Sequence, residues 1–532
     1  MSGNHGSPPR GLDAARSRLH QGRFGRMFRN LAPATFGATE KENQANLAEL
    51  ADKMSAGDSP SNGPDPEESG IPALYTYLGQ FIDHDITFDP VSSLTKFNDP
   101  DGLDDFRTPG LNLDNVYGRG PADQPYMYDD NKFVLGEPVT IGQITAHDLP
   151  RVAVISAGIV TRTRAIIGDP RNDENSIVSQ FQGLFLKFHN RMVDDNPKLA
   201  FEQVQQLVTY HYQYMIVHDF LPKIVTSSVL ESLKEHGQYS KSKLKYYEWK
   251  NDPYMPVEFS VAAYRLGHSM IRPGYQTNSS VKGPLPIFPP AGKTGGLAGF
   301  QPIGPDQVID WGRFIDVDTR PDDGSDDDKS RRLQFAYRID TSLVGPLKSL
   351  PNSVVGSDVS VAEHALGYRN LLRGWRLELP SGQAVARTMN ETPLPDSKIN
   401  IMKAEDGATP EKGQNITEIG KGVFNGNCPL WVYILAEAME HKTKARQIPP
   451  AAGVESNIPP PVRGGSHTPQ LGPVGGRIVA EVFLGLLFGD KTSYLNVDPK
   501  WHPSTGKDFR LKDFVLYALG QGASLVSRAK ET

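Results

Sequence analysis

The chain has 532 residues, of which 38% are hydrophobic and 22% charged, a composition typical of a soluble globular protein. Its net charge of −6 disfavours a general nucleic-acid-binding role, and its single cysteine, Cys428, excludes an internal disulfide framework and a thiolate zinc cluster. No stretch is apolar for long enough to span a bilayer, and the N-terminus lacks the apolar region of a secretory signal. We therefore expect a cytosolic monomer, with export by a signal-independent route as the alternative.

The first 70 residues are polar and rich in turn-forming residues. The run over 55–70, SAGDSPSNGPDPEESG, is typical of a linker or a loop on the surface. No internal repeat divides the remainder of the chain. The sequence therefore predicts a polar extension over 1–70 that wraps the core, followed by one domain over 71–525.

The first predicted helix begins at Ile71 and Pro72, because proline suits a first helical turn. It continues as ALYTYLGQFIDHDI, with apolar residues in helical spacing. Further helices are predicted over 176–194, 200–224, 257–272, 360–373, 428–441 and 473–489. Strand-like alternation is scarce, so the predicted fold is mainly α-helical. Loops such as 98–136 and 273–328 are long for a compact bundle, and a large ligand that organises the interior would explain them.

One candidate site lies at the end of the first helix. Gln80 and His84 are four residues apart and therefore share one helical face. A neutral imidazole can take a proton from one oxygen of a peroxide and return it to the other. The alternative interpretation is an ordinary polar helix end.

A second candidate is the segment GDPRNDE at 168–174. The Arg171 guanidinium would stabilise negative charge that develops on a leaving oxygen. Arg171 and Glu174 are three residues apart, so they either face one pocket together or form a solvated ion pair.

The third candidate is His268, in the apolar segment predicted to be helical over 257–272. Gly267 beside it would let a flat macrocycle approach the backbone, and Arg265 would pair with a haem propionate. A histidine that binds haem iron needs an acceptor for its other ring nitrogen, and Asn370 is the candidate. The alternative is a core histidine without a ligand role.

These segments together resemble the animal-type haem peroxidases, the peroxidase–cyclooxygenase superfamily that includes myeloperoxidase. The order GQFIDHD, TPGLNLDNVYG, GDPRNDE, AYRLGHS and RNLLRG is the order of that family. LKFHNRM and LGPVGGRIVAE also resemble it, so the resemblance covers about residues 70–490.

The resemblance implies a role for each matching residue. It places Gln80, His84 and Arg171 on the distal side of haem b, where H2O2 binds. His268 becomes the iron ligand, with Asn370 as its hydrogen-bond partner and Arg265 as a propionate contact. Asp83 and Glu174 match carboxylates that form ester bonds to haem in mammalian members. The implied reaction is oxidation of small donors by H2O2 through an oxoferryl haem with a porphyrin radical.

Two departures from the family pattern narrow the expected chemistry. Asn175 replaces the methionine that forms a sulfonium link in myeloperoxidase, so bromide, iodide, thiocyanate or phenols are expected as donors rather than chloride. The family also binds Ca²⁺ through oxygen ligands, which suit that ion. Asn112 stands where the family usually has a carboxylate, so weaker binding is expected. The matching calcium ligands are Asp85, Thr108, Gly110, Asn112 and Asp114.

Two alternatives remain. A fatty-acid dioxygenase of the same superfamily would use a tyrosine radical, but Tyr264 lies four residues before His268 rather than three. A non-catalytic adhesion or structural protein on this scaffold would be expected to lose distal residues. The remaining polar residues are interpreted as structural or surface histidines (His189, His211, His218), a core cysteine (Cys428) and a solvated acidic loop (Asp326 to Asp328).

Overall fold

A computed structural model describes residues 22–55, 67–87, 104–105, 107–156, 159–289, 295–317, 333–355, 360–403, 413–444 and 467–526. Helices dominate these ranges, which confirms the predicted mainly α fold. The α-helices are α1 (Glu40–Lys53), α2 (Leu74–Ile86), α3 (Asp114–Tyr117), α4 (Ser176–Asp195), α5 (Phe201–Met215), α6 (Leu221–Ile224), α7 (Ser227–Ser232), α8 (Asn352–Val355), α9 (Leu366–Arg376), α10 (Gly382–Thr388), α11 (Leu430–Glu440), α12 (Pro473–Gly489), α13 (Tyr494–Val497) and α14 (Leu511–Ala518).

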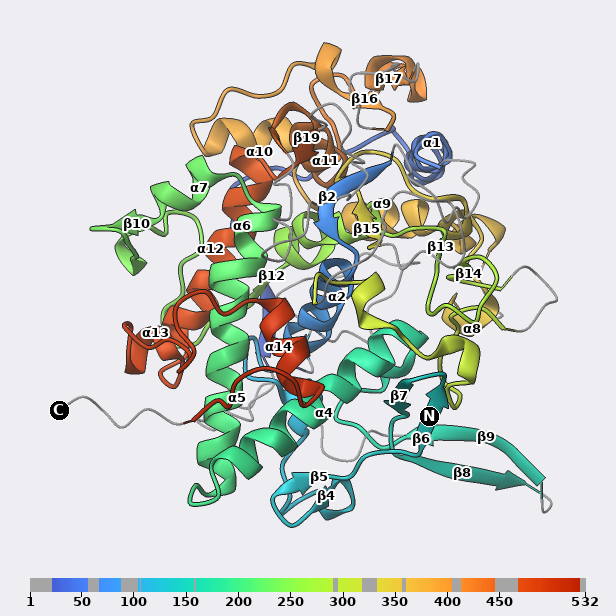
Figure 1. The fold of residues 1–532 in the computed structure, drawn as a ribbon. Helices are drawn as coiled ribbons and strands as arrows, with labels where there is room; N and C mark the ends of the chain where they lie inside the picture. Colours follow the sequence, from blue (N-terminus) through green and yellow to red (C-terminus); the bar gives the residue numbers. More distant parts are fainter. Residues whose placement is uncertain are drawn as a thin grey trace.

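The strands form small sheets, of which β2 and β15 lie near the middle of the molecule and β8 and β9 at its lower right (Figure 1). One sheet has the order β12-β1-β3, and the others are two-stranded. The strands used below are β1 (Gly22–Gly25), β2 (Glu68–Pro72), β3 (Asp104–Asp105), β6 (Pro138–Ile141), β7 (Ile144–His147), β8 (Arg151–Ser156), β9 (Ile159–Ala165), β12 (Met255–Pro256) and β15 (Phe335–Tyr337). The β8–β9 hairpin projects from the body at the lower right of Figure 1, a feature that the sequence analysis did not predict.

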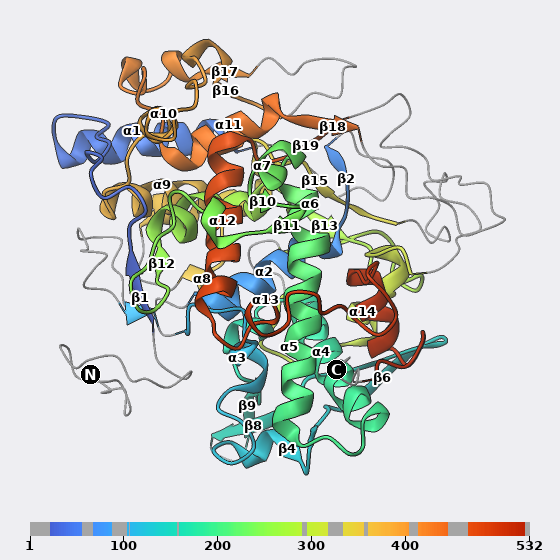
Figure 2. The ribbon, with the colours of Figure 1, turned by 90° about the vertical axis from the view of Figure 1, so that its left-hand side faces the viewer.

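Helix α2 lies in the interior in both views, surrounded by other helices (Figure 1 and Figure 2). Its side chains Leu74, Leu78, Phe81 and Ile82 have no exposed surface. Phe81 stacks on Phe185 of α4 with ring centroids 4.4 Å apart, so aromatic packing joins the two helices. This packing holds the C-terminal end of α2, where Gln80 and His84 lie.

The N-terminal segment packs on the core, and we propose that it serves as a wrapping extension of the 71–525 domain. β1 pairs in parallel with β12, more than two hundred residues later in the chain. The backbone amides of Met27 and Phe28 donate to the buried carboxylate of Glu258, at 3.1 and 3.0 Å. α1 packs against α9, with Leu47 and Leu50 fully buried.

Most predicted helices are present, but two boundaries are wrong. Ile71 and Pro72 belong to β2, which pairs with β15, and α2 begins only at Leu74. Residues 361–364 form a 3₁₀ turn before α9, so the helix predicted over 360–373 begins later. The predicted α12 range is correct, and α4 extends one residue beyond its prediction.

The prediction of one helix over 257–272 is wrong, and this difference has a greater consequence for the site. It consists of a π-helical turn, Glu258–Ala262, followed by a 3₁₀ segment, Ala263–His268. The two hydrogen-bonding patterns change the rotation per residue, which redirects the side chains that follow. A second π turn, Ile216–Phe220, divides the helix predicted over 200–224. Periodicity alone does not reveal either turn.

Among the helices of the described ranges, none combines the length and the apolar character that crossing a bilayer requires. Cys428 is fully buried, as expected of a core residue. His189 and His211 are buried structural residues, whereas His218 is exposed, as expected of a surface histidine. Asp326 to Asp328 lie outside the described residues.

Acid should destabilise the fold through its buried histidines. Burial lowers the pKa of His211 from 6.5 to about 4, and that of His189 to the same value. Below its ordinary pKa each imidazole takes up a proton in the unfolded chain but not in the folded protein. The stabilisation is therefore complete at neutral pH and decreases as the pH falls toward 4. Between pH 7 and pH 5 the loss is about 2 kcal/mol per histidine.

His211→Phe tests this expectation, because His211 packs between the aromatic rings of Trp501 and Phe509. We expect the difference in unfolding free energy between pH 7 and pH 5 to shrink by about 2 kcal/mol in the variant. Denaturant unfolding at both pH values measures it. An unchanged difference would show that His211 is protonated in the folded protein as readily as in the unfolded chain.

Candidate functional site

The predicted distal and proximal segments line one cavity of about 450 Å³. α2 and the turn before α4 form one part of its wall, and the 3₁₀ segment Ala263–His268 and α9 form another. Its size is within the range of cofactor and ligand pockets. The predicted residues on its wall are Gln80, Asp83, His84, Arg171, Glu174, Arg265, His268 and Asn370.

His268 is a neutral imidazole held by an amide. Burial, and then the Arg265 charge, lower the pKa of His268 to about 3. Its Nδ1 lies 2.7 Å from the side-chain amide of Asn370, which presents either its nitrogen or its oxygen depending on a half-turn of the group. With the oxygen facing Nδ1, the proton stays on Nδ1 and the Nε2 lone pair is available to a metal.

The residue before His268, Gly267, bears on whether a haem fits. A Cβ built on Gly267 would meet no atom within 4 Å, so the backbone beside His268 borders open space within the cavity. This is the approach that a flat macrocycle needs. Neutral His268 and open Gly267 together fit a haem on this side.

Arg265 connects the two parts of the wall. Its Nη1 lies 3.8 Å from Oδ2 of Asp83 on α2, and its Nε donates to the backbone oxygen of Ser260 at 2.8 Å. The structure thus places the predicted propionate contact beside the predicted ester residue.

His84 is oriented by a residue that the sequence analysis missed. Its Nδ1 lies 2.7 Å from Oδ1 of Asn172, and the Asn172 amide donates to Oε1 of Gln182 at 2.8 Å. Because Oδ1 only accepts, Nδ1 carries the proton and Nε2 is the basic nitrogen. Burial first, and then Arg171, lower the pKa of His84, which keeps the imidazole neutral. Asn172 stands inside GDPRNDE, so its position within that segment was the available signal.

Arg171 is held by Asp169 rather than by Glu174. Its Nη2 donates to Oδ2 of Asp169 at 2.8 Å and to the backbone oxygen of His84 at 2.9 Å. Burial would raise the pKa of Asp169, but Arg171 and then Arg107 hold that pKa below its usual value. Asp169 and the His84 carbonyl therefore orient the guanidinium, and not the Arg171–Glu174 ion pair that the sequence left open.

Glu174 joins the glutamine and the histidine of α2. Gln80 donates to Oε1 of Glu174, and the same oxygen lies 3.6 Å from Nε2 of His84. Asn175 caps α4 by accepting from the backbone amides of Ile177 and Val178, and its amide lies 3.4 Å from Oε1 of Gln80. Asn175, which replaces the methionine of myeloperoxidase, is thus the N-cap of α4.

Arg369 and Arg373 of α9 also line the cavity and were not predicted as site residues. Arg373 follows Asn370 by three residues and so shares its helical face. That spacing was visible in RNLLRG. Both guanidinium groups are further candidates for binding an anionic group of a cofactor.

The predicted calcium ligands lie together beside α2. Oδ2 of Asp85 accepts from the backbone amide of Leu113 at 3.2 Å, whereas the buried Oδ1 has no hydrogen-bond partner among the described residues. Burial, and then Asp114, raise the pKa of Asp85, and burial raises that of Asp114 to about 6. An unpartnered carboxylate oxygen beside the half-buried carboxylate of Asp114 fits a cation with oxygen ligands.

The same loop holds a competing positive charge. Nη1 of Arg107 lies 3.4 Å from Oδ1 of Asp114, and its Nε donates to Asp169 at 3.0 Å. The Asn112 side chain stays within the loop, where its Oδ1 accepts a hydrogen bond from the backbone amide of Asp114 at 3.1 Å. No group of three or more histidine, cysteine or acidic side chains in the described ranges is arranged to hold a metal. Among the proposed calcium ligands, the carboxylates are those of Asp85 and Asp114.

Comparison with known proteins supports the resemblance to the animal-type haem peroxidases. Residues 145–286 match the family model "Animal haem peroxidase", a range that includes Arg171, Glu174 and His268. The chain is 28% identical over 119 residues to a dual oxidase of Drosophila melanogaster and 27% identical over 117 residues to a thyroid peroxidase of Canis lupus familiaris. Each alignment covers 20% of this chain, and 7% and 12% of the respective relative. The chain therefore spans only a small part of their length.

Solved structures share the fold at low identity. Peroxidase A from Dictyostelium discoideum superposes with a TM-score of 0.55 at 14% identity, over 90% of this chain and 89% of that one. A fatty acid alpha-dioxygenase from Oryza sativa gives 0.51 at 14% identity, over 94% and 79%. The fold alone thus accommodates both kinds of protein.

Proposed function

We propose that this member of the peroxidase–cyclooxygenase superfamily is a haem peroxidase that uses H2O2 to oxidise small donors. The observation that carries the proposal is one cavity lined by two neutral histidines, each with an amide at Nδ1. His268 would hold the iron of haem b, and His84 would serve as the acid–base group toward H2O2.

On the proximal side the chain supplies binding and orientation. His268 offers its Nε2 lone pair, and Asn370 fixes the ring through Nδ1. Arg265, Arg369 and Arg373 supply positive charge for the two propionates. When bound, the haem supplies the iron and the conjugated ring that accept electrons from donors.

On the distal side the chain moves one proton. Nε2 of His84 would take a proton from one oxygen of H2O2 and return it to the other, which would leave as water. Arg171, held by Asp169 and the His84 carbonyl, stabilises the negative charge on the leaving oxygen. Gln80 would position water or a small anion beside His84. Asp83 and Glu174 are the carboxylates that we propose for ester attachment to the haem.

The donors that we propose are bromide, iodide, thiocyanate and phenols. Asn175 caps α4 and carries no sulfur, so no sulfonium link draws electron density from the ring. A steady-state screen of these donors with chloride as the comparison tests the proposal. Oxidation of iodide without oxidation of chloride is the expected result. Oxidation of chloride at a comparable rate would contradict the role assigned to Asn175.

Fatty-acid oxygenation is the second candidate. The Tyr264 hydroxyl donates to the backbone oxygen of Gly79 at 3.2 Å, and the ring stacks on Phe259. Burial, and then Asp83, raise the pKa of Tyr264 well above its usual value. Incubation with linoleate and O₂ distinguishes the candidates. Hydroperoxide formation that Tyr264→Phe abolishes would favour the dioxygenase over the peroxidase.

We also propose Ca²⁺ binding at Asp85, Thr108, Gly110, Asn112 and Asp114. An ion that binds only the folded protein stabilises it by about 2.7 kcal/mol at a hundred times its dissociation constant. Ca²⁺ is therefore expected to raise the melting temperature, and EDTA to reverse the increase.

Asp85→Asn should remove most of this calcium response, because Asp85 holds the unpartnered oxygen. Asp123→Asn, a change at an exposed carboxylate, is the control that should retain it. A melting temperature that is independent of calcium in the wild type would exclude the site.

A further inference from the structure

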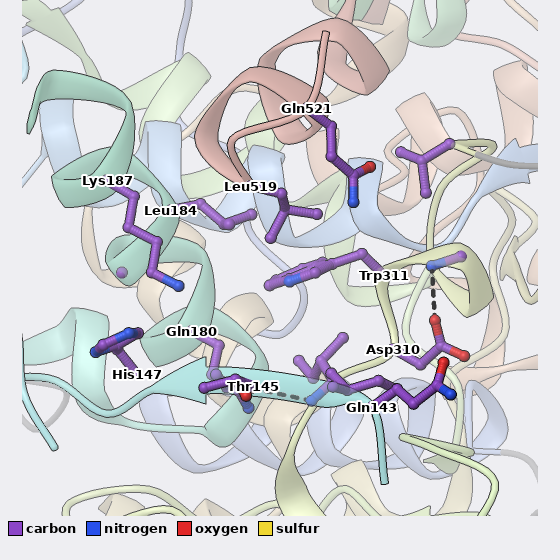
Figure 3. A pocket seen from close by; sticks show the side chains of 16 residues that line it. Gln143, Thr145, His147, Gln180, Leu184, Lys187, Asp310, Trp311, Leu519 and Gln521 are labelled. Atoms are coloured by element: carbon purple, nitrogen blue, oxygen red, sulfur yellow. Dashed lines mark hydrogen bonds between the residues drawn. The ribbon is translucent and has the colours of Figure 1, made fainter. Parts of the chain in front are cut away.

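A second cavity of about 310 Å³ lies outside the candidate haem site (Figure 3). It is bounded by α4, the β6–β7 hairpin, the 3₁₀ turn at Trp311–Arg313 and the segment after α14. α4 contributes Gln180, Gly183, Leu184 and Lys187, whose spacing places them on one helical face. None of these residues lines the first cavity.

The wall of this second cavity combines positive charge with a flat aromatic ring. Burial lowers the pKa of Lys187, and no carboxylate of the described residues pairs with its amine. His147 uses Nδ1 to contact the backbone oxygen of Gly136 at 3.1 Å. Figure 3 shows the Trp311 indole reaching across the cavity toward Lys187 and His147. Asp310, the acidic residue on the wall, accepts from the amide of Gly312 at 3.2 Å.

This combination suits a ligand that has both a carboxylate and an aromatic ring. An amine without a carboxylate partner in a half-buried site gains most from an anionic ligand. Leu184 and Leu519 add apolar surface beside the indole, on which an aromatic ring would pack.

A continuous series of aromatic rings joins the two cavities. The Trp311 and Phe314 centroids are 6.4 Å apart, and Phe314 stacks on Tyr275 at 5.7 Å. Tyr275 meets Tyr77 edge to face at 5.5 Å, and Tyr77 of α2 lines the first cavity. Trp311 is thus in contact with the candidate haem site through three intervening rings.

We propose that the second cavity binds phenolic carboxylates and that this series of rings carries their electrons to the haem. The inference rests on the proposed peroxidase function, whose oxidant is the haem oxidised by H2O2. Trp311 loses one electron, which passes through Phe314, Tyr275 and Tyr77 to that oxidant. The bound phenol then returns one electron to Trp311 and releases its hydroxyl proton to His147 or water. The phenol leaves as a phenoxyl radical, and the haem has gained one electron.

The two tyrosines act as bridges that keep their protons. The Tyr275 hydroxyl accepts from the backbone amide of Arg272 at 3.0 Å. Burial raises the pKa of both phenols. Tyr275 raises the pKa of Tyr77 further, whereas the hydrogen bonds with Arg272 and Tyr77 lower that of Tyr275. Trp311 is the ring of the series that lines the second cavity, so it is the residue that exchanges an electron with the bound donor.

The binding arm uses the haem-loaded enzyme and ferulate as the phenolic carboxylate. Lys187→Gln is expected to weaken ferulate binding, measured by calorimetry, on the order of tenfold, the loss of one charge-assisted hydrogen bond. Equal affinity in Lys187→Gln and wild type, or no ferulate binding by the wild type, would overturn the site.

The electron-transfer arm compares Trp311→Phe with Trp501→Phe, a matched change at a tryptophan that is not part of the series. Trp311→Phe should slow ferulate oxidation at least about tenfold while iodide oxidation stays unchanged, and Trp501→Phe should change neither. In the wild type, peroxide with a spin trap should leave a trapped adduct on Trp311, detected by mass spectrometry. Undiminished ferulate oxidation by Trp311→Phe, or no adduct at Trp311, would overturn the proposal.

Failure of the proposed function gives a different result. A wild type that oxidises neither iodide nor ferulate with H2O2 contradicts the peroxidase assignment and the electron path together. The calorimetric comparison of Lys187→Gln still decides whether the second cavity binds the carboxylate.

Discussion

His84→Ala is expected to slow the reaction with H2O2 by about 10²–10⁴-fold, the usual contribution of a positioned acid–base group. The variant should bind haem as well as the wild type, because His84 contacts Asn172 and Glu174 and is not the proposed iron ligand. Stopped-flow measurement of the Soret band after mixing with peroxide gives the rate. The absorbance of the resting protein gives the haem content.

Asn172→Ala is the companion variant, because Asn172 orients His84 without itself reaching the peroxide. It should lower the rate by less than His84→Ala and should alter its pH dependence, since Nδ1 loses its acceptor. If His84→Ala reacts with peroxide as fast as the wild type, His84 is not the acid–base group.

His268→Ala is expected to remove most haem binding, because the cavity loses its only proposed iron ligand. The expected losses differ between His268 and its partner Asn370. Removing an outer partner of a metal ligand usually costs about 10–100-fold in affinity, so Asn370→Ala should fall in that range and His268→Ala should exceed it. Haem titration followed by the Soret band measures both.

Imidazole added to His268→Ala provides the control, since a free ligand that enters the vacated space should restore part of the Soret band. Thermal unfolding of the haem-free variant checks that the fold is retained. Full haem affinity in a folded His268→Ala variant would show that the iron is bound elsewhere.

The parts of the site that the sequence predicted are those that local patterns determine. Gln80 and His84 share a helical face because α2 is a regular helix there, and both line the cavity. The range of α12 was predictable because its apolar run has a proline at its start and Asp490 after its end. The resemblance to the family, carried by the order of the motifs, was needed to combine the separate segments into one site.

The missed parts depend on residues far apart in the chain. His84 and Asn172 are 88 residues apart, and no helical spacing relates them. A proline such as Pro72 is suited both to the first turn of a helix and to an edge strand. Pairing of Pro72 with Phe335 places it in strand β2. The π and 3₁₀ turns before His268 form within packed surroundings, where tertiary contacts override local propensity.

The hydrogen bond that the backbone amide of Phe28 donates to Glu258 has a consequence for the order in which the molecule is made. The two residues are 230 positions apart, so the ribosome completes β1 long before the carboxylate that its neighbouring amides will bind. Glu258 begins the π turn that leads to His268. The side of the cavity that holds His268 therefore cannot reach its final geometry until about half of the chain has been synthesised and has returned to its own beginning. Capture of the proposed haem would accordingly be a late event in biogenesis, and early pairing of β1 with another chain would compete with it.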